Sequence, residues 1–199
     1  MSKKRSYVLK QRAESQEATR ERIVEAAMEL HGELGPRATS ISAIAERAGV
    51  QRLTVYRHFP TEADVFAACS SHFMMLNPPP DAAQWRMESD PVQRARIAIT
   101  AFHEYYAETA YMWKRVLDDE RSVSALTNPI GQYRQMIIDI ADDLATAFKA
   151  GRRRRMLAAT LEHALFFPTW FDLDSRGLGN REKASLALAW IAGILVEAG

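Results

Sequence analysis

The chain has 199 residues, of which 47% are apolar and 26% are charged, values that predict a globular protein and exclude a chain that is disordered throughout. The formal net charge is only +1, yet residues 1–60 carry 11 Lys and Arg against 7 Asp and Glu, or +4, while the remaining 15 against 18 give −3. A basic excess confined to the first third is typical of a segment that meets a polyanion.

The single cysteine, Cys69, excludes an intrachain disulfide and fits a reducing compartment. The N-terminus lacks the apolar stretch of a signal peptide, and the longest apolar run, residues 186–196, is too short to span a bilayer. We therefore expect a cytoplasmic protein with no membrane partner.

Residues 1–12 contain five Lys and Arg and no acid. Two interpretations stay open: a disordered, solvated tail, or a basic arm that follows phosphates or enters the minor groove of DNA. From Glu14 onward apolar residues recur at helical spacing, so that residues 20–34 are expected to form a scaffold helix.

Residues 40–59, SISAIAERAGVQRLTVYRHF, predict two short helices joined by a tight turn. Ser40 can cap the first helix, whose apolar residues recur three and four positions apart. Gly49 can adopt positive φ, so the chain can reverse there and enter a second helix with Val55 and Phe59 facing inward. The pattern is that of a helix-turn-helix.

The outward side chains of the second helix suit a DNA groove. Arg reads guanine or phosphate, Gln and Thr donate and accept hydrogen bonds, Tyr reaches phosphate, and Leu touches a thymine methyl. Together with polar residues at the start of the first helix, the predicted DNA-binding set is Thr39, Ser40, Ser42, Gln51, Arg52, Leu53, Thr54, Tyr56, Arg57 and His58.

A larger ordered combination resembles the N-terminal domain of TetR-type transcriptional regulators. It consists of RERIVEAAMELHGEL (20–34), Gly35, the Thr39-Ser40 cap, IAERAGV, VYRHFP and a new helix from Thr61. The resemblance implies a dimeric DNA-binding protein that typically releases DNA when a ligand binds its second domain. Glu62 departs from the pattern, because the family commonly has a phosphate-binding Lys there, although Glu suits the helix dipole.

The remaining chain predicts further helices. After a helix over 61–76, three consecutive prolines (78–80) make residues 77–90 a semi-rigid connection. Asp90-Pro91 and Asn128-Pro129 are helix starts. The expected helices cover about 91–109, 111–121, 128–151, 152–173 with a break near Pro168, and 181–198.

No sustained period-two alternation predicts a strand, so the expected fold class is all-α with about nine helices. A three-helix helix-turn-helix DNA-binding domain with its basic arm occupies residues 1–60, and a helical ligand-binding and dimerisation domain occupies residues 61–199. Within the second domain, the run Arg152 to Arg155 opposes the helix dipole. It is interpreted either as a solvated turn or as a contact with phosphate or an acidic partner.

Aromatic rings with few polar tips gather in the second domain, as expected either of a small-molecule pocket or of a helical core. The resemblance favours a pocket. The predicted ligand-binding residues are Phe102, His103, Tyr106, Trp113, Tyr133, His163, Phe166 and Trp170.

The last helix contains SLALAWIAGILV (185–196), apolar nearly all round, which a surface helix of a monomer cannot be. HALFFPTWFDL and GLGNREKASLALAWI also resemble the C-terminal helices that usually form the dimer interface of TetR-like regulators. The predicted interface residues are Leu186, Ala189, Trp190, Gly193 and Ile194.

No phosphate loop, metal-binding helix or nucleophile elbow is recognisable, so no enzyme activity, cofactor or metal is expected. The prediction is a ligand-responsive transcriptional repressor that binds an inverted-repeat operator in double-stranded DNA as a homodimer and is released by a small-molecule effector. The alternatives are an all-α interaction scaffold without DNA binding and, less favoured, a small helical enzyme.

Overall fold

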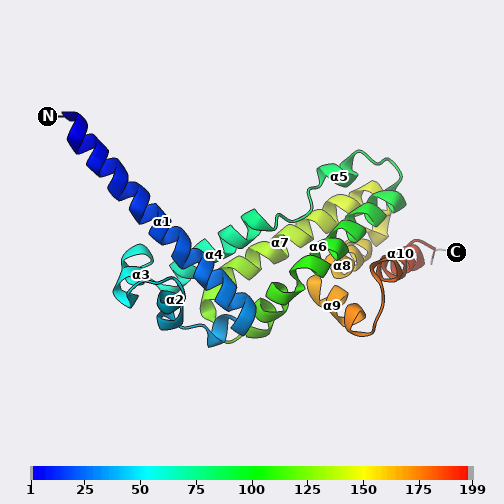
Figure 1. Cartoon of the computed structure of the whole chain (residues 1–199). Coiled ribbons are helices and arrows are strands. Elements are labelled where there is room, and N and C mark those ends of the chain that lie inside the picture. Colours follow the sequence, from blue (N-terminus) through cyan, green and yellow to red (C-terminus); the bar gives the residue numbers. More distant parts are fainter. Residues whose placement is uncertain (1, 197–199) are drawn as a thin grey trace. The chain divides into compact units, whose positions relative to one another are not determined.

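The computed structural model describes residues 2–196, which form ten α-helices, three short 3-10 helices and no strand. The all-α fold class is thereby confirmed, with one helix more than expected. The elements (Figure 1) are α1 (Ser2–Leu34), η1 (Pro36–Ala38), α2 (Ile41–Arg47), α3 (Arg52–His58), α4 (Glu62–Leu76), α5 (Ala83–Arg86), α6 (Pro91–Asp119), η2 (Ser124–Leu126), α7 (Thr127–Ala147), η3 (Gly151–Arg153), α8 (Arg154–Leu165), α9 (Phe167–Ser175) and α10 (Asn180–Val196).

These elements form two compact units. The first contains the chain up to residue 78 together with residues 114–129, and the second contains residues 79–113 and the chain from residue 130. α4 lies with the helix-turn-helix because Val65 and Cys69 are part of its core. The functional division at residue 60 stays a prediction.

The core of the first unit is built by the apolar stripe of α1 and the inward faces of α2, α3 and α4. Its buried members are Ile23, Val24, Ala26, Ala27, Leu30, Ile41, Ile44, Ala45, Ala48, Val55, Phe59, Val65 and Cys69. Val55 and Phe59 face inward, as the spacing predicts. Each buried Val, Ile, Leu or Phe contributes about 1.5–3 kcal/mol, so α1 and the inward faces of α2, α3 and α4 together hold this small domain.

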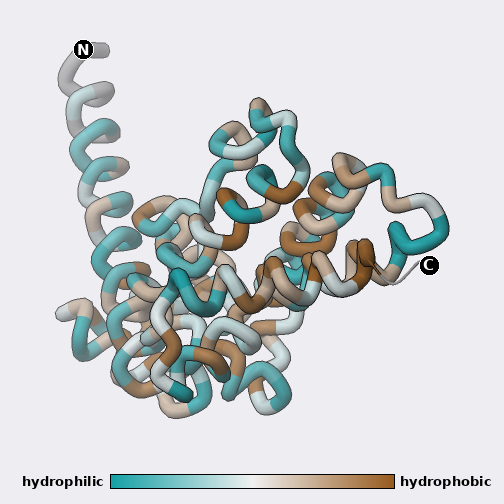
Figure 2. The backbone as a smooth tube through the Cα atoms, turned by 90° about the vertical axis from the view of Figure 1, so that its right-hand side faces the viewer, coloured by the Kyte–Doolittle hydropathy of each residue, from teal (hydrophilic) through white to brown (hydrophobic). Residues whose placement is uncertain are grey.

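The expectation that the helical pattern begins at Glu14 is wrong, because α1 begins at Ser2, and of the two interpretations of residues 1–12 the disordered tail does not agree with this helix. Side-chain pairs four residues apart support this first half: Gln11 Nε2 donates to the Tyr7 hydroxyl (3.2 Å), and Lys10 Nζ lies 3.8 Å from Glu14 Oε1. Residues 10–18 are exposed, and this segment extends away from α2 and α3 (Figure 1) and is largely hydrophilic (Figure 2). The arm is therefore helical.

The expectation of two helices over about 91–109 and 111–121 is also wrong, since α6 runs without a break from Pro91 to Asp119. Residues 105–119 contain neither Gly nor Pro. The Thr109 hydroxyl donates a hydrogen bond to the Tyr105 carbonyl oxygen (2.6 Å) in the preceding turn of the same helix. A polar residue at this point therefore does not end the helix.

In the second unit, the expected break near Pro168 is confirmed. α8 ends at Leu165, Phe166 is extended (φ −83°, ψ 135°), and Pro168 lies in the first turn of α9. Within the connection over 77–90, α5 carries the fully buried Trp85. None of the described helices is both long and apolar enough to cross a membrane.

Part of the basic run now has a structural role. The Arg153 guanidinium donates through Nη1 to the carbonyl oxygens of Ile194 (2.9 Å) and Leu195 (2.7 Å). These carbonyls lie in the last turn of α10, where the helix leaves acceptors unpaired and its dipole favours a cation. Arg153 thus ties the start of α8 to the end of α10.

Candidate nucleic-acid interface and effector region

The helix-turn-helix is fixed by local hydrogen bonds that begin at Ser40. The Ser40 hydroxyl accepts from the Ala43 N–H (3.1 Å), as an N-cap does. At the other end of α2, Gly49 has φ +65°, its N–H donates to Glu46 O, and the Val50 N–H donates to Ala45 O (2.9 Å). This pair of bonds is a Schellman motif, which needs a glycine in the left-handed region and sets the angle between α2 and α3.

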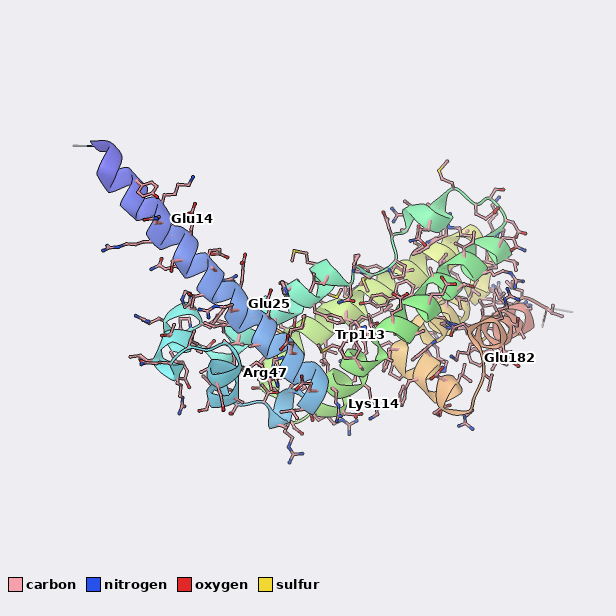
Figure 3. The ribbon with its side chains drawn as sticks, viewed as in Figure 1. Glu14, Glu25, Arg47, Trp113, Lys114 and Glu182 are labelled. Atoms are coloured by element: carbon pink, nitrogen blue, oxygen red, sulfur yellow. The ribbon has the colours of Figure 1, made fainter. Side chains whose placement is uncertain are left out.

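Two arginines hold α2 against α1. Arg47 (labelled in Figure 3) pairs with Glu33 (2.9 Å) and Glu29 (3.1 Å), and Arg22 Nη1 donates to the Ala48 carbonyl (3.2 Å). The hydrogen bond from Arg47 lowers the pKa of Glu33. Arg47 is therefore a structural cation of the domain, directed to α1.

The predicted reading residues gather on one short element. Four of these residues are exposed: Gln51, Arg52, Leu53, which is 69% exposed, and Arg57. The other three are half-buried: Thr54, Tyr56 and His58. An exposed leucine beside two guanidinium groups is costly for solubility and suits a groove with phosphates and methyl groups. α3 thus presents the mixed surface that base reading requires.

The reading side chains are also paired with one another. Arg52 Nη2 donates to the Tyr56 hydroxyl (3.1 Å), and its guanidinium lies 5.5 Å from the centre of the Tyr56 ring. Arg57 Nη2 donates to Thr54 Oγ1 (2.9 Å). The Tyr56 hydroxyl, predicted as a phosphate contact, is thus first of all an acceptor for Arg52.

The residues before α2 serve the turn itself. Thr39 Oγ1 donates to the Gly35 carbonyl (2.8 Å), and Ser40 is occupied as the N-cap, whereas Ser42 is exposed. The start of the next helix has a complete capping box, in which Thr61 accepts from the Asp64 N–H (3.2 Å) and its own N–H donates to Asp64 Oδ2 (2.9 Å). Glu62 is exposed in that first turn.

A groove of about 640 Å³ opens between α1, the turn after α3, and α4. Apolar Val24, Phe59 and Met75 line it together with the carboxylates of Glu17 and Glu21. His58 is the one predicted DNA-binding residue on its wall, and the predicted ligand-binding residues lie elsewhere.

Most predicted ligand-binding residues form a buried aromatic cluster around Tyr106 in the second unit. Ring centroids lie 5.9 Å (Phe102), 6.5 Å (Trp113) and 6.0 Å (Trp170) from that of Tyr106. Trp113 stacks obliquely on Tyr133 at 4.2 Å, and Phe166 stacks on Tyr133 at 5.7 Å. His163 is exposed, with its ring 5.9 Å from that of Trp190.

Two tyrosine hydroxyls bridge the break between α8 and α9. The Tyr106 hydroxyl donates to the Leu165 carbonyl (2.8 Å), so the 2.7 Å bond between the two hydroxyls must have Tyr133 as its donor. The Phe167 N–H donates to the Tyr133 oxygen (3.0 Å). A directed chain from Phe167 through both hydroxyls to Leu165 thus satisfies backbone groups that the break leaves unpaired, and burial raises the pKa of both tyrosines.

His103 contributes a polar edge to the cluster. Its Nε2 lies 3.3 Å from the Ala164 carbonyl, and burial lowers its pKa to about 4, so the ring is neutral. Because a carbonyl only accepts, Nε2 carries the hydrogen and Nδ1 is an acceptor, with no partner among the described residues. Those residues also contain no group of three His, Cys, Asp or Glu placed to hold a metal.

Lys183 is a buried cation that contacts the aromatic cluster through the ring of Trp170. Lys183, 1% exposed, donates to Asp174 Oδ1 (2.6 Å) and Asn180 Oδ1 (3.1 Å) and stands 4.5 Å above the centre of the Trp170 ring. Asn180 also accepts from Trp170 Nε1 (3.3 Å). These contacts lock the α9–α10 turn and hold Trp170 in place.

The chain thus carries, within an all-α fold, a helix-turn-helix whose first helix is capped by Ser40 and whose second helix exposes arginines, an arrangement suited to DNA binding. Residues 23–69 match the family model "Bacterial regulatory proteins, tetR family". The matched segment contains the helix-turn-helix and part of α4, and it is similar to the DNA-binding domain of TetR-family transcriptional regulators, as the sequence pattern predicts; the scaffold alternative is not favoured.

Solved structures share the whole fold. A TetR-like transcriptional regulator from Rhodococcus sp. RHA1 is 16% identical with a TM-score of 0.69, covering 90% of this chain and 97% of that one. A mutant of the HlyIIR protein is 17% identical with a TM-score of 0.64 (92% and 100%), and the multidrug binding protein EbrR complexed with imidazole is 15% identical with a TM-score of 0.59 (90% and 91%). No curated protein matches the sequence.

Proposed function

We propose that this regulator represses transcription as a homodimer that places α3 of each subunit in the major groove of an inverted-repeat operator. The observation that carries the proposal is that Gln51, the N-cap residue of α3, and Arg52, Leu53 and Arg57 on α3 itself are all exposed. A two-fold dimer sets two such helices about 34–36 Å apart, on successive turns of DNA.

Selection of bound sequences from a random duplex pool tests DNA reading. The wild-type protein should select an inverted repeat. Arg52→Ala should relax one base pair in each half-site, with a loss of discrimination of about tenfold or more, because a bidentate contact to guanine is removed. Arg176→Ala, which removes an exposed arginine from the end of α9, serves as the control and should select the wild-type sequence. Recovery of no preferred sequence by the wild-type protein would refute the proposal.

The dimer is supported by the outward face of α10. Val196 is 78% exposed, Ala189, Ala192 and Gly193 are exposed, and a Cβ added to Gly193 would meet no atom within 4 Å. The predicted interface residues Leu186, Trp190 and Ile194 are half-buried on the same helix. Burial of such a face against a second copy is favourable by about 25 cal/mol per Å².

Sedimentation of two charge variants tests the interface. Ala192→Glu places a carboxylate near its symmetry mate and should yield monomers at micromolar concentration with weakened operator binding. Ala107→Glu puts the same charge on an exposed alanine of α6 and should leave the dimer intact. Dimerisation of Ala192→Glu with wild-type affinity would exclude this face.

Effector binding to the aromatic cluster is the third part of the proposal. The unpartnered acceptor His103 Nδ1 among aromatic rings favours an uncharged aromatic effector that donates a hydrogen bond. The structural likeness to EbrR, a multidrug binding protein complexed with imidazole, supports a small-molecule site. Imidazole, which carries a ring N–H, is the first probe: it should change tryptophan fluorescence and release DNA over one concentration range, and His103→Leu should weaken both responses. Saturation of the fluorescence while DNA stays bound would contradict coupling.

A further inference from the structure

The last turn of α6 belongs to the same compact unit as the helix-turn-helix, since residues 114–129 group with the chain up to Pro78. Within that unit, Asp119 is the final residue of α6. Its Oδ2 accepts a hydrogen bond of 2.9 Å from the Arg37 backbone N–H, across 82 residues of sequence. Arg37 lies in η1, the short turn that leads into α2.

This turn is built so that a carboxylate can approach it. Gly35 has φ +88°, and a Cβ at this position would lie 2.7 Å from Asp119 Oδ2. Any other residue at position 35 would therefore be strained and would also displace the carboxylate. The glycine is needed for the turn and for the contact.

The remaining bonds of the turn make it rigid up to the start of α2. The Gly35 N–H donates to the His31 carbonyl (3.1 Å), the Thr39 N–H donates to the Pro36 carbonyl (3.2 Å), and the Thr39 hydroxyl donates to the Gly35 carbonyl (2.8 Å). Ser40, the N-cap of α2, follows directly. A hydrogen bond that fixes the Arg37 amide therefore also restrains the position of the start of α2.

We propose that Asp119 is a positioning residue for DNA reading, which fixes the start of α2, and with it α3, through the Arg37 amide. α6 also carries Phe102, Tyr106 and Trp113 of the aromatic cluster. The helix that contributes to the proposed effector site therefore ends at Asp119, the residue that accepts the hydrogen bond from the turn before α2. The proposal rests on DNA reading by α3 and is independent of the dimer face and of the effector's identity.

The first measurement is amide hydrogen exchange of Arg37 in the full chain without DNA. Asp119→Ala removes the acceptor and should speed exchange of this amide about three- to tenfold, the range expected for loss of one modest hydrogen bond. Asp119→Asn keeps an acceptor oxygen and should restore most of the protection. Asp118→Ala is the matched control: this neighbour is exposed and paired with Lys114 on α6 itself, and its loss should leave Arg37 unchanged.

The second measurement is the ratio of affinities for the duplex selected by the wild-type protein and for a scrambled duplex. Asp119→Ala should lower this ratio about three- to tenfold, because base contacts need a fixed α3 whereas phosphate contacts tolerate movement. Its urea unfolding midpoint should match that of Asp118→Ala, which separates positioning from a merely structural role.

Unchanged exchange at Arg37, or an affinity ratio within twofold of that of Asp118→Ala, would overturn the proposal. An equal loss for both duplexes together with a lowered unfolding midpoint would also overturn it, because the residue would then only stabilise the fold. If the wild-type protein selects no sequence, the function proposed above fails, while the exchange experiment still decides whether Asp119 holds the turn.

Discussion

Replacement of Tyr133 by Phe tests the hydroxyl chain that bridges the α8–α9 break. The substitution removes one oxygen, so the buried Phe167 N–H loses its acceptor and the Tyr106 oxygen loses its donor. A buried group left unpaired costs about 1–3 kcal/mol, so loss at both ends should total about 3 kcal/mol. This is a large share of the roughly 5–15 kcal/mol by which domains are stable.

Urea unfolding followed by tryptophan fluorescence measures the loss. Tyr111→Phe is the control, since that hydroxyl lies on a side chain that is 54% exposed, and it should change stability by less than about 0.5 kcal/mol. Tyr106→Phe removes the donor to Leu165, and the double variant should lose less than the sum because both hydroxyls belong to one chain. A loss below about 1 kcal/mol for Tyr133→Phe, or strict additivity, would refute the directed chain.

Three further predictions concern the reading helix, the buried histidines and the end of α10. In gel-shift assays, Arg52→Ala and Tyr56→Phe should be non-additive, because Arg52 donates to the Tyr56 hydroxyl; additive losses would show that the pair separates on DNA. Burial lowers the pKa of His31 and of His103 to about 4, whereas in the unfolded chain they take up protons near 6.5. Below pH 6.5 the unfolded state then binds more protons than the folded state. The free energy of unfolding should therefore be highest above pH 6.5 and should fall by about 3 kcal/mol per histidine as the pH drops towards 4. Urea unfolding midpoints should fall less steeply with pH for His103→Leu than for the wild type, whereas His163→Gln, which changes an exposed ring, should behave as the wild type does. Arg153→Ala should speed amide exchange in the last turn of α10 and weaken the proposed dimer, whereas Arg152→Ala, an exposed neighbour, should do neither.

Local signals made the DNA-binding domain predictable. Ser40, Gly49 and Thr61 each act on groups within a few residues, so that the sequence itself contains both partners of each bond. The break before Pro168 has the same origin, because a proline restricts the residues next to it.

Features that depend on distant partners could not be found in this way. Asp119 and Arg37 are 82 residues apart, and nothing near either residue indicates that a carboxylate meets a backbone amide. Gly35 was recognised only as part of the family resemblance, and the close approach of Asp119 to this position was not predicted. In the run Arg152 to Arg155, nothing in the sequence distinguishes Arg153 from its neighbours, because its hydrogen-bond acceptors on α10 lie 41 and 42 residues further along the chain.

The boundaries of α1 and α6 failed for a different reason. Sequence reasoning looked for an apolar stripe to extend α1, yet its first half is supported by pairs such as Lys10 with Glu14 along its own surface. For α6 it expected a break near Thr109, which instead hydrogen-bonds within the helix. Helix without tertiary burial leaves only a weak trace in hydrophobic periodicity.

Because Cys69 is buried, an introduced surface cysteine can be labelled without competition from the native thiol. Its Sγ lies 3.4 Å from His31 Nδ1 in the core of the first unit, and burial raises the pKa of the thiol to about 12. At pH 7 this thiol is therefore almost entirely protonated and unreactive, and its side chain is only 4% exposed. A maleimide or spin label would therefore react with a single introduced cysteine, for example Glu62→Cys in the exposed first turn of α4, without removal of the native one. In the proposed dimer, the distance between the two labels, one in each subunit, would report in solution how far apart the two helix-turn-helix units lie, with and without DNA.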